Sequence, residues 1–200
     1  KVEAMMPMRE YPKTEKYFVG DKVLALLMEV RESENGSAEV ILSRSSPEFV
    51  KQLLIQEVPE LSDGTIVIDK IVREAGYRTK LTVHSTDFKV DPVGACVGVR
   101  GNRVKNIVRE LYNEKIDIIP FSNNLLELLQ NILAPIEIRK INVNEEDSVV
   151  SIVVDDEDFA VVIGKKGMNA RLIGKLIDRQ LEVQRLTDYN CTMALLREEW

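Results

Sequence analysis

The chain has 200 residues, of which 44% are hydrophobic and 30% charged, and its formal net charge is −6. This composition is ordinary for a soluble globular protein of one large domain or two to three small ones. The acidic balance argues against a globally basic nucleic-acid binder, although it leaves room for a local basic surface.

The sequence predicts neither a membrane span nor a secretory signal, because it has no run of eighteen apolar residues and no apolar leader. It starts at Lys1 and enters strand-like sequence at once, so we expect a fragment of a longer protein. Cys96 and Cys191 lie far apart and His84 is the one histidine, so no metal site and no cofactor are expected. Cys96 is predicted to be a small buried hydrophobe, and a reducing cytoplasm suits both cysteines.

Residues 1–46 are predicted to form β structure. Strands are expected at 2–7, 21–32 and 37–45, with the last two forming a hairpin around the turn signal Glu34-Asn35-Gly36. Three strands do not close a barrel easily, so this segment is interpreted as the later part of a small β-barrel whose first strands are absent.

From Ser46 the pattern changes to a mixture of helices and strands. Pro47 suits the first turn of a helix over 46–58, and Asp63-Gly64 marks a turn. The elements expected after this turn are strands at 65–74 and 78–85, an apolar helix at 93–98, a Gly-x-x-Gly turn at 98–101, a helix at 102–112 and a strand at 115–119.

After Pro120 the same order begins again. The expected elements are a helix at 123–133, strands at 136–143 and 147–154, a short helix at 158–164, a Gly-x-x-Gly turn at 164–167, a helix at 169–177 and a strand at 180–186. Residues 190–200 are compatible with a short helix or with a frayed end.

These two segments form an internal repeat in register. Gly98 and Gly101 map onto Gly164 and Gly167 at a separation of 66 residues (98 to 164). The same separation relates three apolar positions at helical spacing, which should face a core, and three basic ones. The apolar pairs are Val104 with Ala170, Ile107 with Ile173 and Leu111 with Ile177; the basic pairs are Arg100 with Lys166, Lys105 with Arg171 and Arg109 with Lys175.

A single Gly-x-x-Gly is most simply a tight corner between two helices that ends on a capping glycine. Here the motif occurs twice in register with basic middle residues, and the local charge is +3 over 94–115 and +4 over 159–185. Glycines let a polyanionic backbone approach the main chain, and the next helix N-terminus favours phosphate oxygens. The pattern therefore favours a nucleic-acid ligand. Single-stranded RNA is preferred to duplex DNA, because no helix has an isolated arginine-rich face for the major groove.

At these residues the chain resembles a known family. DPVGACVGVRGNRVKNIVREL (91–111) with EKIDII (114–119) is similar to the first K-homology (KH) domain of the NusA family of bacterial transcription factors, and DDEDFAVVIGKKGMNARLIGKLI (155–177) is similar to the second. AMMPMREYPKTEKYFVGDKVLALLMEV (4–30) and ILSRSSPEFVKQLLIQEVPEL (41–61) look like the end of that family's S1 domain and its junction into KH.

The resemblance implies an α+β fold in which a partial S1 (OB-like) β-barrel precedes two tandem type II KH domains. The implied bounds are 1–46 for the partial S1 domain, 47–121 and 122–188 for the KH domains and 189–200 for a tail. In that family these modules bind nascent RNA and modulate termination and antitermination, while a domain absent here contacts RNA polymerase. The RNA contacts that carry over are Gly98, Val99, Arg100, Gly101, Arg103, Lys105, Gly164, Lys165, Lys166, Gly167, Asn169 and Arg171, and we add Lys175 from the repeat.

Other functions fit the sequence less well. A ribosomal KH protein fits poorly with S1-like sequence ahead of two KH units, and polynucleotide phosphorylase has the opposite domain order. A P-loop enzyme needs G-x-x-x-x-G-K-[ST], which Gly164–Gly167 does not provide, and Asp155-Asp156 is interpreted as a loop and helix cap rather than an acid–base pair. No catalytic constellation is found, so no enzyme is predicted. A purely structural scaffold remains the alternative that does not need RNA.

Overall fold

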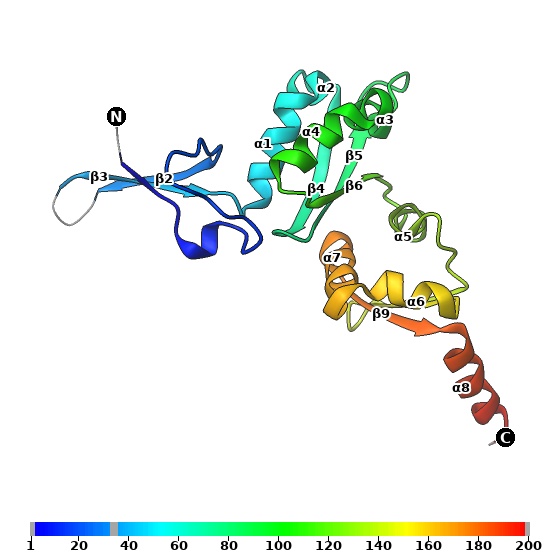
Figure 1. The fold of residues 1–200 in the computed structure, drawn as a ribbon. Coiled ribbons are helices and arrows are strands. Elements are labelled where there is room, and N and C mark those ends of the chain that lie inside the picture. Colours follow the sequence, from blue (N-terminus) through cyan, green and yellow to red (C-terminus); the bar gives the residue numbers. More distant parts are fainter. Residues whose placement is uncertain (1–2, 33–35, 199–200) are drawn as a thin grey trace. The chain divides into compact units, whose positions relative to one another are not determined.

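The computed structural model describes residues 3–32 and 36–198. It divides into two compact units, Lys1–Ile118 and Ile119–Trp200. The fold is α+β, as expected, and its strands form three open three-stranded sheets (Figure 1). Each unit is described by itself below.

The first sheet belongs to the N-terminal segment of the first unit. Its strands are β1 (Ala4–Met5), β2 (Leu26–Glu32) and β3 (Ala38–Ser43), in the order β1-β3-β2, and a 3-10 helix, η1 (Met8–Glu10), follows β1. The antiparallel β2–β3 pair confirms the expected hairpin, whereas Glu34 and Asn35 of the predicted turn lie outside the described residues. The second strand was expected from residue 21 but begins at Leu26, because Leu26 pairs with Ser43, the last residue of β3.

The first repeat follows directly. Ser46 caps α1 by accepting a hydrogen bond from the Glu48 amide, as Ser and Thr do at helix starts. Pro59 begins a second, short helix that sequence reasoning did not predict. The elements are α1 (Pro47–Glu57), α2 (Pro59–Ser62), β4 (Ile66–Glu74), β5 (Arg78–Ser85), α3 (Pro92–Val97), η2 (Val99–Gly101), α4 (Asn102–Glu110) and β6 (Lys115–Pro120), with sheet order β4-β5-β6.

One hydrophobic core holds the first repeat together. The helices α1, α3 and α4 cover one face of the sheet (Figure 1). Ile107 and Leu111 of the repeat register are both buried there, as the helical spacing predicted. The core consists of Phe49, Val50, Leu53, Leu54, Val58, Ile66, Leu81, Val83, Cys96, Ile107 and Leu111.

The second repeat has the same order of elements. They are α5 (Leu125–Leu133), β7 (Lys140–Asn144), β8 (Val149–Val154), α6 (Asp156–Ile163), η3 (Lys165–Gly167), α7 (Met168–Ile177) and β9 (Gln180–Arg185), with sheet order β7-β8-β9. The strand expected over 136–143 begins instead at Lys140, because its partner β8 ends just beyond Val153, which pairs with Lys140. Ile173 and Ile177 are buried at the positions equivalent to Ile107 and Leu111.

The C-terminal segment is helical. The helix α8 (Leu186–Glu198) begins directly after β9, so the structure favours a helix over a frayed end, and it starts before the tail proposed from residue 189. The Thr187 amide and hydroxyl donate hydrogen bonds to Asp156, which fixes the start of α8 against α6.

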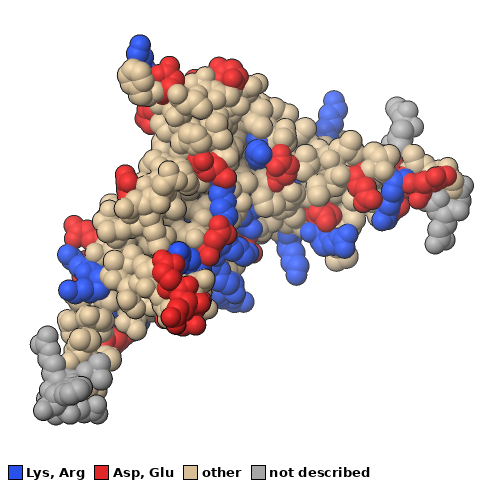
Figure 2. Space-filling model, turned by 180° about the vertical axis from the view of Figure 1, so that it is seen from behind, with Lys and Arg blue, Asp and Glu red and all other residues tan. Residues whose placement is uncertain are grey.

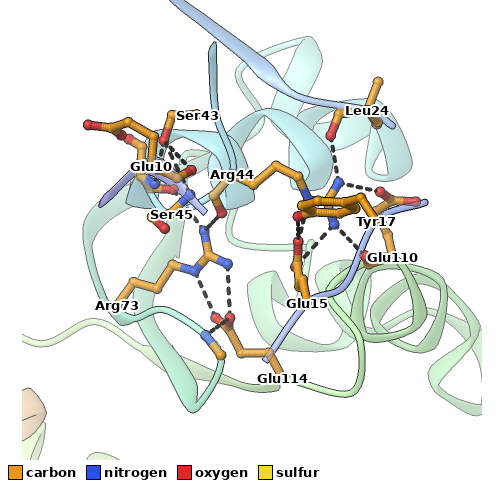
Figure 3. A network of polar contacts seen from close by, with 12 residues as sticks. Glu10, Glu15, Tyr17, Leu24, Ser43, Arg44, Ser45, Arg73, Glu110 and Glu114 are labelled. Atoms are coloured by element: carbon orange, nitrogen blue, oxygen red, sulfur yellow. Dashed lines mark hydrogen bonds and ion pairs between the residues drawn. The ribbon is translucent and has the colours of Figure 1, made fainter. Parts of the chain in front are cut away.

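A buried ionic network joins the first sheet to the first repeat within the first unit (Figure 3). Arg44, between β3 and α1, donates hydrogen bonds to Glu15 at 2.6 Å, to the Leu24 carbonyl and to Glu110 at the end of α4 at 2.8 Å. Its guanidinium also lies over the rings of Phe49 and Tyr112. Glu15 and Arg44 are almost fully buried, so this pair is shielded from solvent.

A second buried ion pair extends the network. Arg73 of β4 pairs with Glu114, which lies between α4 and β6, through two hydrogen bonds of 2.9 Å. The remaining nitrogen of Arg73 donates to the carbonyls of Arg44 and Ser46. The network therefore connects the N-terminal loop, the segment entering α1 and the end of α4.

Candidate nucleic-acid interface

The two Gly-x-x-Gly turns have the same backbone conformation. Gly98 and Gly164 have φ values of 76° and 70° and end the preceding helices α3 and α6. The amides of Gly101 and Gly167 donate hydrogen bonds to the carbonyls of Gly98 and Gly164, at 3.0 and 3.2 Å. The sequence register at 66 residues is thus reproduced in the geometry of the turns.

The third residue of each turn is left-handed although it is not glycine. Arg100 has φ 54° and Lys166 has φ 53°, followed by Gly101 and Gly167 at 75° and 72°. A positive φ is uncommon for residues other than glycine, and its recurrence at equivalent positions of both repeats points to a functional role. The conformation presents two adjacent side chains to solvent just ahead of a helix N-terminus.

The middle residues of both turns are exposed. Val99 retains 80% of its accessible surface, and Arg100, Lys165 and Lys166 are also exposed. Each turn leads directly into a helix, α4 at Asn102 and α7 at Met168. Cationic side chains therefore stand beside the positive end of a helix, where phosphate oxygens bind favourably.

The predicted residues beyond the turns fall into two groups. Lys105, Arg171 and Lys175 are exposed, and the Lys105 ammonium donates to the Arg100 carbonyl at 2.9 Å. Arg103 and Asn169 point inward instead. Arg103 is paired with Glu60 at 2.9 Å, and Asn169 retains only 5% of its accessible surface.

A contact between a cation and an aromatic ring in the second repeat was not predicted. Arg185, at the end of β9, lies over the ring of Phe159 in α6, 4.6 Å from its centroid. No local spacing links these two residues, so sequence reasoning had no signal for the contact. Figure 2 shows Lys and Arg side chains projecting from the surface with Asp and Glu side chains among them, so this face is not uniformly basic.

Family models match both repeats. The NusA-like first KH domain matches residues 44–121, and the NusA-like second KH domain matches residues 125–191. The chain belongs to the NusA family. Both repeats are KH domains, and the Gly-x-x-Gly turns lie inside them.

Curated relatives agree with this family. The transcription termination/antitermination protein NusA of Halalkalibacterium halodurans is 40% identical over 199 residues, which make up 100% of this chain and 52% of that protein. The protein of the same name from Borreliella burgdorferi is 40% identical over 183 residues (91% of this chain, 38% of that protein), and that from Bacillus subtilis is 39% identical over 188 residues (94% and 50%). The chain thus spans about half the length of these NusA proteins, or less.

The acidic pair of this NusA-family chain is engaged in structural contacts. Asp155 accepts hydrogen bonds from Arg139, which lower the pKa of its carboxyl, and those from Thr187 lower the pKa of Asp156. A general acid needs the opposite shift. Asp155 occupies the N-cap position of α6, as predicted, but its side chain makes no capping hydrogen bond.

Three further observations concern metals, membranes and the histidine. In the described part of the chain, no group of three His, Cys, Asp or Glu side chains is arranged to hold a metal ion. Over the same residues, each helix is too short or too polar to cross a bilayer. His84 Nδ1 lies 2.8 Å from a carboxylate oxygen of Asp69 on the neighbouring strand.

The two cysteines of this NusA-family chain should differ sharply in reactivity. Cys96 is fully buried in the core, and burial raises the pKa of its thiol to about 11, whereas Cys191 is exposed on α8. Only about 0.1% of a thiol with that pKa is thiolate at pH 8. Alkylation of the native protein, read by peptide mass spectrometry, should therefore label Cys191 and spare Cys96.

The pH dependence of alkylation also tests the buried position of Cys96. Labelling of Cys96 should rise about tenfold per pH unit up to its pKa, because a raised pKa delays thiolate formation to higher pH. In denaturant the two cysteines should react at similar rates. Equal labelling of both in the native protein would contradict the buried position of Cys96.

Proposed function

We propose that this chain binds single-stranded RNA through its two Gly-x-x-Gly turns, as part of a transcription elongation, termination and antitermination factor that acts on nascent RNA. The carrying observation is the recurrence of one turn conformation, with exposed cations ahead of a helix N-terminus, in both KH domains. KH domains of this kind clamp about four nucleotides, and two linked modules gain avidity. The relatives' name, transcription termination/antitermination protein, supports the cellular role.

The contacts proposed for RNA are the turn residues together with the exposed cations Lys105, Arg171 and Lys175. The sheet of β1, β2 and β3 is proposed to be part of an S1 (OB-like) barrel, with domain bounds at 1–46, 47–121, 122–188 and 189–200. It is an open sheet whose β2 exposes Leu27 and Val30, which fits a barrel completed by further strands. A non-enzymatic role in the bacterial cytoplasm completes the proposal. The proposed protein partners are RNA polymerase, through a domain outside this chain, and other transcription factors.

The test is the salt dependence of RNA binding. Fluorescence anisotropy with a labelled, unstructured single-stranded RNA of about 12 nucleotides would be measured from low to high salt. If each turn neutralises about two phosphates, log affinity should fall with log salt at a slope of about −3, because single strands lose about 0.7 per phosphate contact. Duplex DNA of the same length should bind more weakly.

Three results would contradict the proposal. A flat salt response would show that phosphates are not contacted, and tighter binding of the duplex would favour another nucleic-acid class. Absence of any RNA binding would favour the scaffold alternative.

A further inference from the structure

The second residue of the helix after each turn forms a hydrogen bond with the helix before the turn. Arg103 donates from its guanidinium to the Ala95 carbonyl at 2.6 Å. Asn169 donates from its side-chain amide to the carbonyls of Val161 and Val162, at 3.3 and 3.0 Å. Positions 103 and 169, and likewise 95 and 161, are equivalent in the repeat register. Two different residue types thus make the same contact in both repeats.

The acceptors explain why a donor is needed at this position. The last carbonyls of a helix have no partner within it, and a buried carbonyl without a partner is costly. The helices α3 and α6 end at Gly98 and Gly164, where the chain turns away with positive φ. A side chain that bonds to these carbonyls from the next helix spans the turn and fixes the two helix ends relative to each other.

The packing of Arg103 supports the same role. Its stem lies directly against Gly98, since a Cβ on Gly98 would be 2.8 Å from the Arg103 Cγ. Its guanidinium is also held by Glu60 of α2, and its side chain retains 30% exposure. The charge of Arg103 is therefore already paired with a carboxylate at the position where a phosphate contact was predicted.

We infer that Arg103 and Asn169 are positioning residues, which hold the two turns in their RNA-receiving conformation and do not contact the RNA. This inference rests on the proposed RNA binding. It reassigns two of the residues predicted as RNA contacts, and it leaves Lys105 and Arg171, two positions further along each helix, as the phosphate-facing cations.

The test combines amide exchange without RNA and salt-dependent RNA binding. The variants are Arg103→Met, which keeps the stem, and Asn169→Ala; Lys105→Met and Arg171→Met are the matched cation controls. Each positioning variant should speed hydrogen exchange of its own turn amide, Gly101 or Gly167, about tenfold, because it loses the side-chain hydrogen bonding to the preceding helix. RNA affinity should fall about tenfold with an unchanged salt slope.

The controls should differ from the positioning variants in the salt dependence of RNA binding. Lys105→Met and Arg171→Met should each reduce the salt slope by about 0.7, as loss of one phosphate contact does. Hydrogen exchange of the turn amides is measured without RNA, so it tests the positioning role even if the wild-type protein does not bind RNA. Absence of RNA binding by the wild-type protein would overturn only the proposed function.

The inference is overturned if Arg103→Met reduces the salt slope as its control does, or if turn exchange is unchanged in both positioning variants. Asn169→Ser, which retains a donor, should restore slow exchange and RNA affinity toward wild-type values. Thermal melting identifies a variant that fails to fold. If either Arg103→Met or Asn169→Ala fails to fold, the other variant tests the inference.

Discussion

Replacing the middle residues of both turns by aspartate should abolish RNA binding in a protein that remains folded. The variant combines Val99→Asp, Arg100→Asp, Lys165→Asp and Lys166→Asp. It removes three exposed cations and adds four carboxylates at the proposed phosphate sites. With each charge-assisted contact contributing roughly 1 kcal/mol or more, affinity for single-stranded RNA should fall at least ~100-fold. Fluorescence anisotropy against wild-type protein measures this loss.

The backbone of the turns explains why folding should survive. Arg100 and Lys166 occupy the left-handed region, which aspartate tolerates better than most residues. All four positions are exposed, so no charge is buried. Melting temperature and circular dichroism should remain close to wild type.

A control with charge reversals away from the turns separates the turns from general electrostatics. Lys51→Glu and Lys140→Glu reverse cations on α1 and β7 and should leave RNA affinity within a few fold of wild type. Equal loss in this control, or full RNA binding by the aspartate variant, would contradict the assignment of the turns.

Removing the carboxylate of Glu114 should destabilise the first unit more than any surface change. Glu114 is 1% exposed and accepts hydrogen bonds from Arg73, the Gly76 amide and the Thr79 hydroxyl, at 2.7 to 2.9 Å. Glu114→Ala would leave the fully buried Arg73 charge without its partner. Breaking a buried pair in this way costs about 3–5 kcal/mol, against a typical total of about 5–15 kcal/mol. Urea unfolding followed by far-ultraviolet circular dichroism would measure the expected decrease in the midpoint of the unfolding transition.

Two further variants identify the cause of that loss. Arg73→Met combined with Glu114→Leu removes both charges and should recover much of the stability, since an apolar pair of similar volume avoids the uncompensated charge. Arg31→Ala breaks an ion pair with Glu39 that lies at the surface, and should leave the midpoint unchanged. A small effect of Glu114→Ala would show that the network is not tightly coupled to folding.

Local patterns predicted most of the elements and their repetition. Apolar residues at helical spacing placed Ile107 and Ile173 in cores, and the register of 66 residues is matched by helices that begin at 102 and 168. The closing strands β6 and β9 begin at 115 and 180, one residue short of that register. Helix periodicity, turn glycines and caps act over a few residues, so the sequence displays them directly.

The same local patterns could not place the ends of strands or the direction of polar side chains. The strands β2 and β7 begin where a partner strand is available, which depends on residues far along the chain. The family resemblance places Arg103 and Asn169 among the RNA contacts, and the local sequence cannot test this, because a basic or polar residue after a turn has the same pattern whether it faces solvent or a neighbouring helix.

The sequence by itself therefore determined the repeated helix–turn–helix corners, their glycines and their cations, because these depend on neighbouring residues. Only the tertiary structure decided which of those cations are exposed, and that Glu15, Arg44 and Glu110 meet in one buried network. The physical reason is that burial and ion pairing are set by residues tens of positions apart, and desolvation rather than local propensity decides which polar groups are paired there.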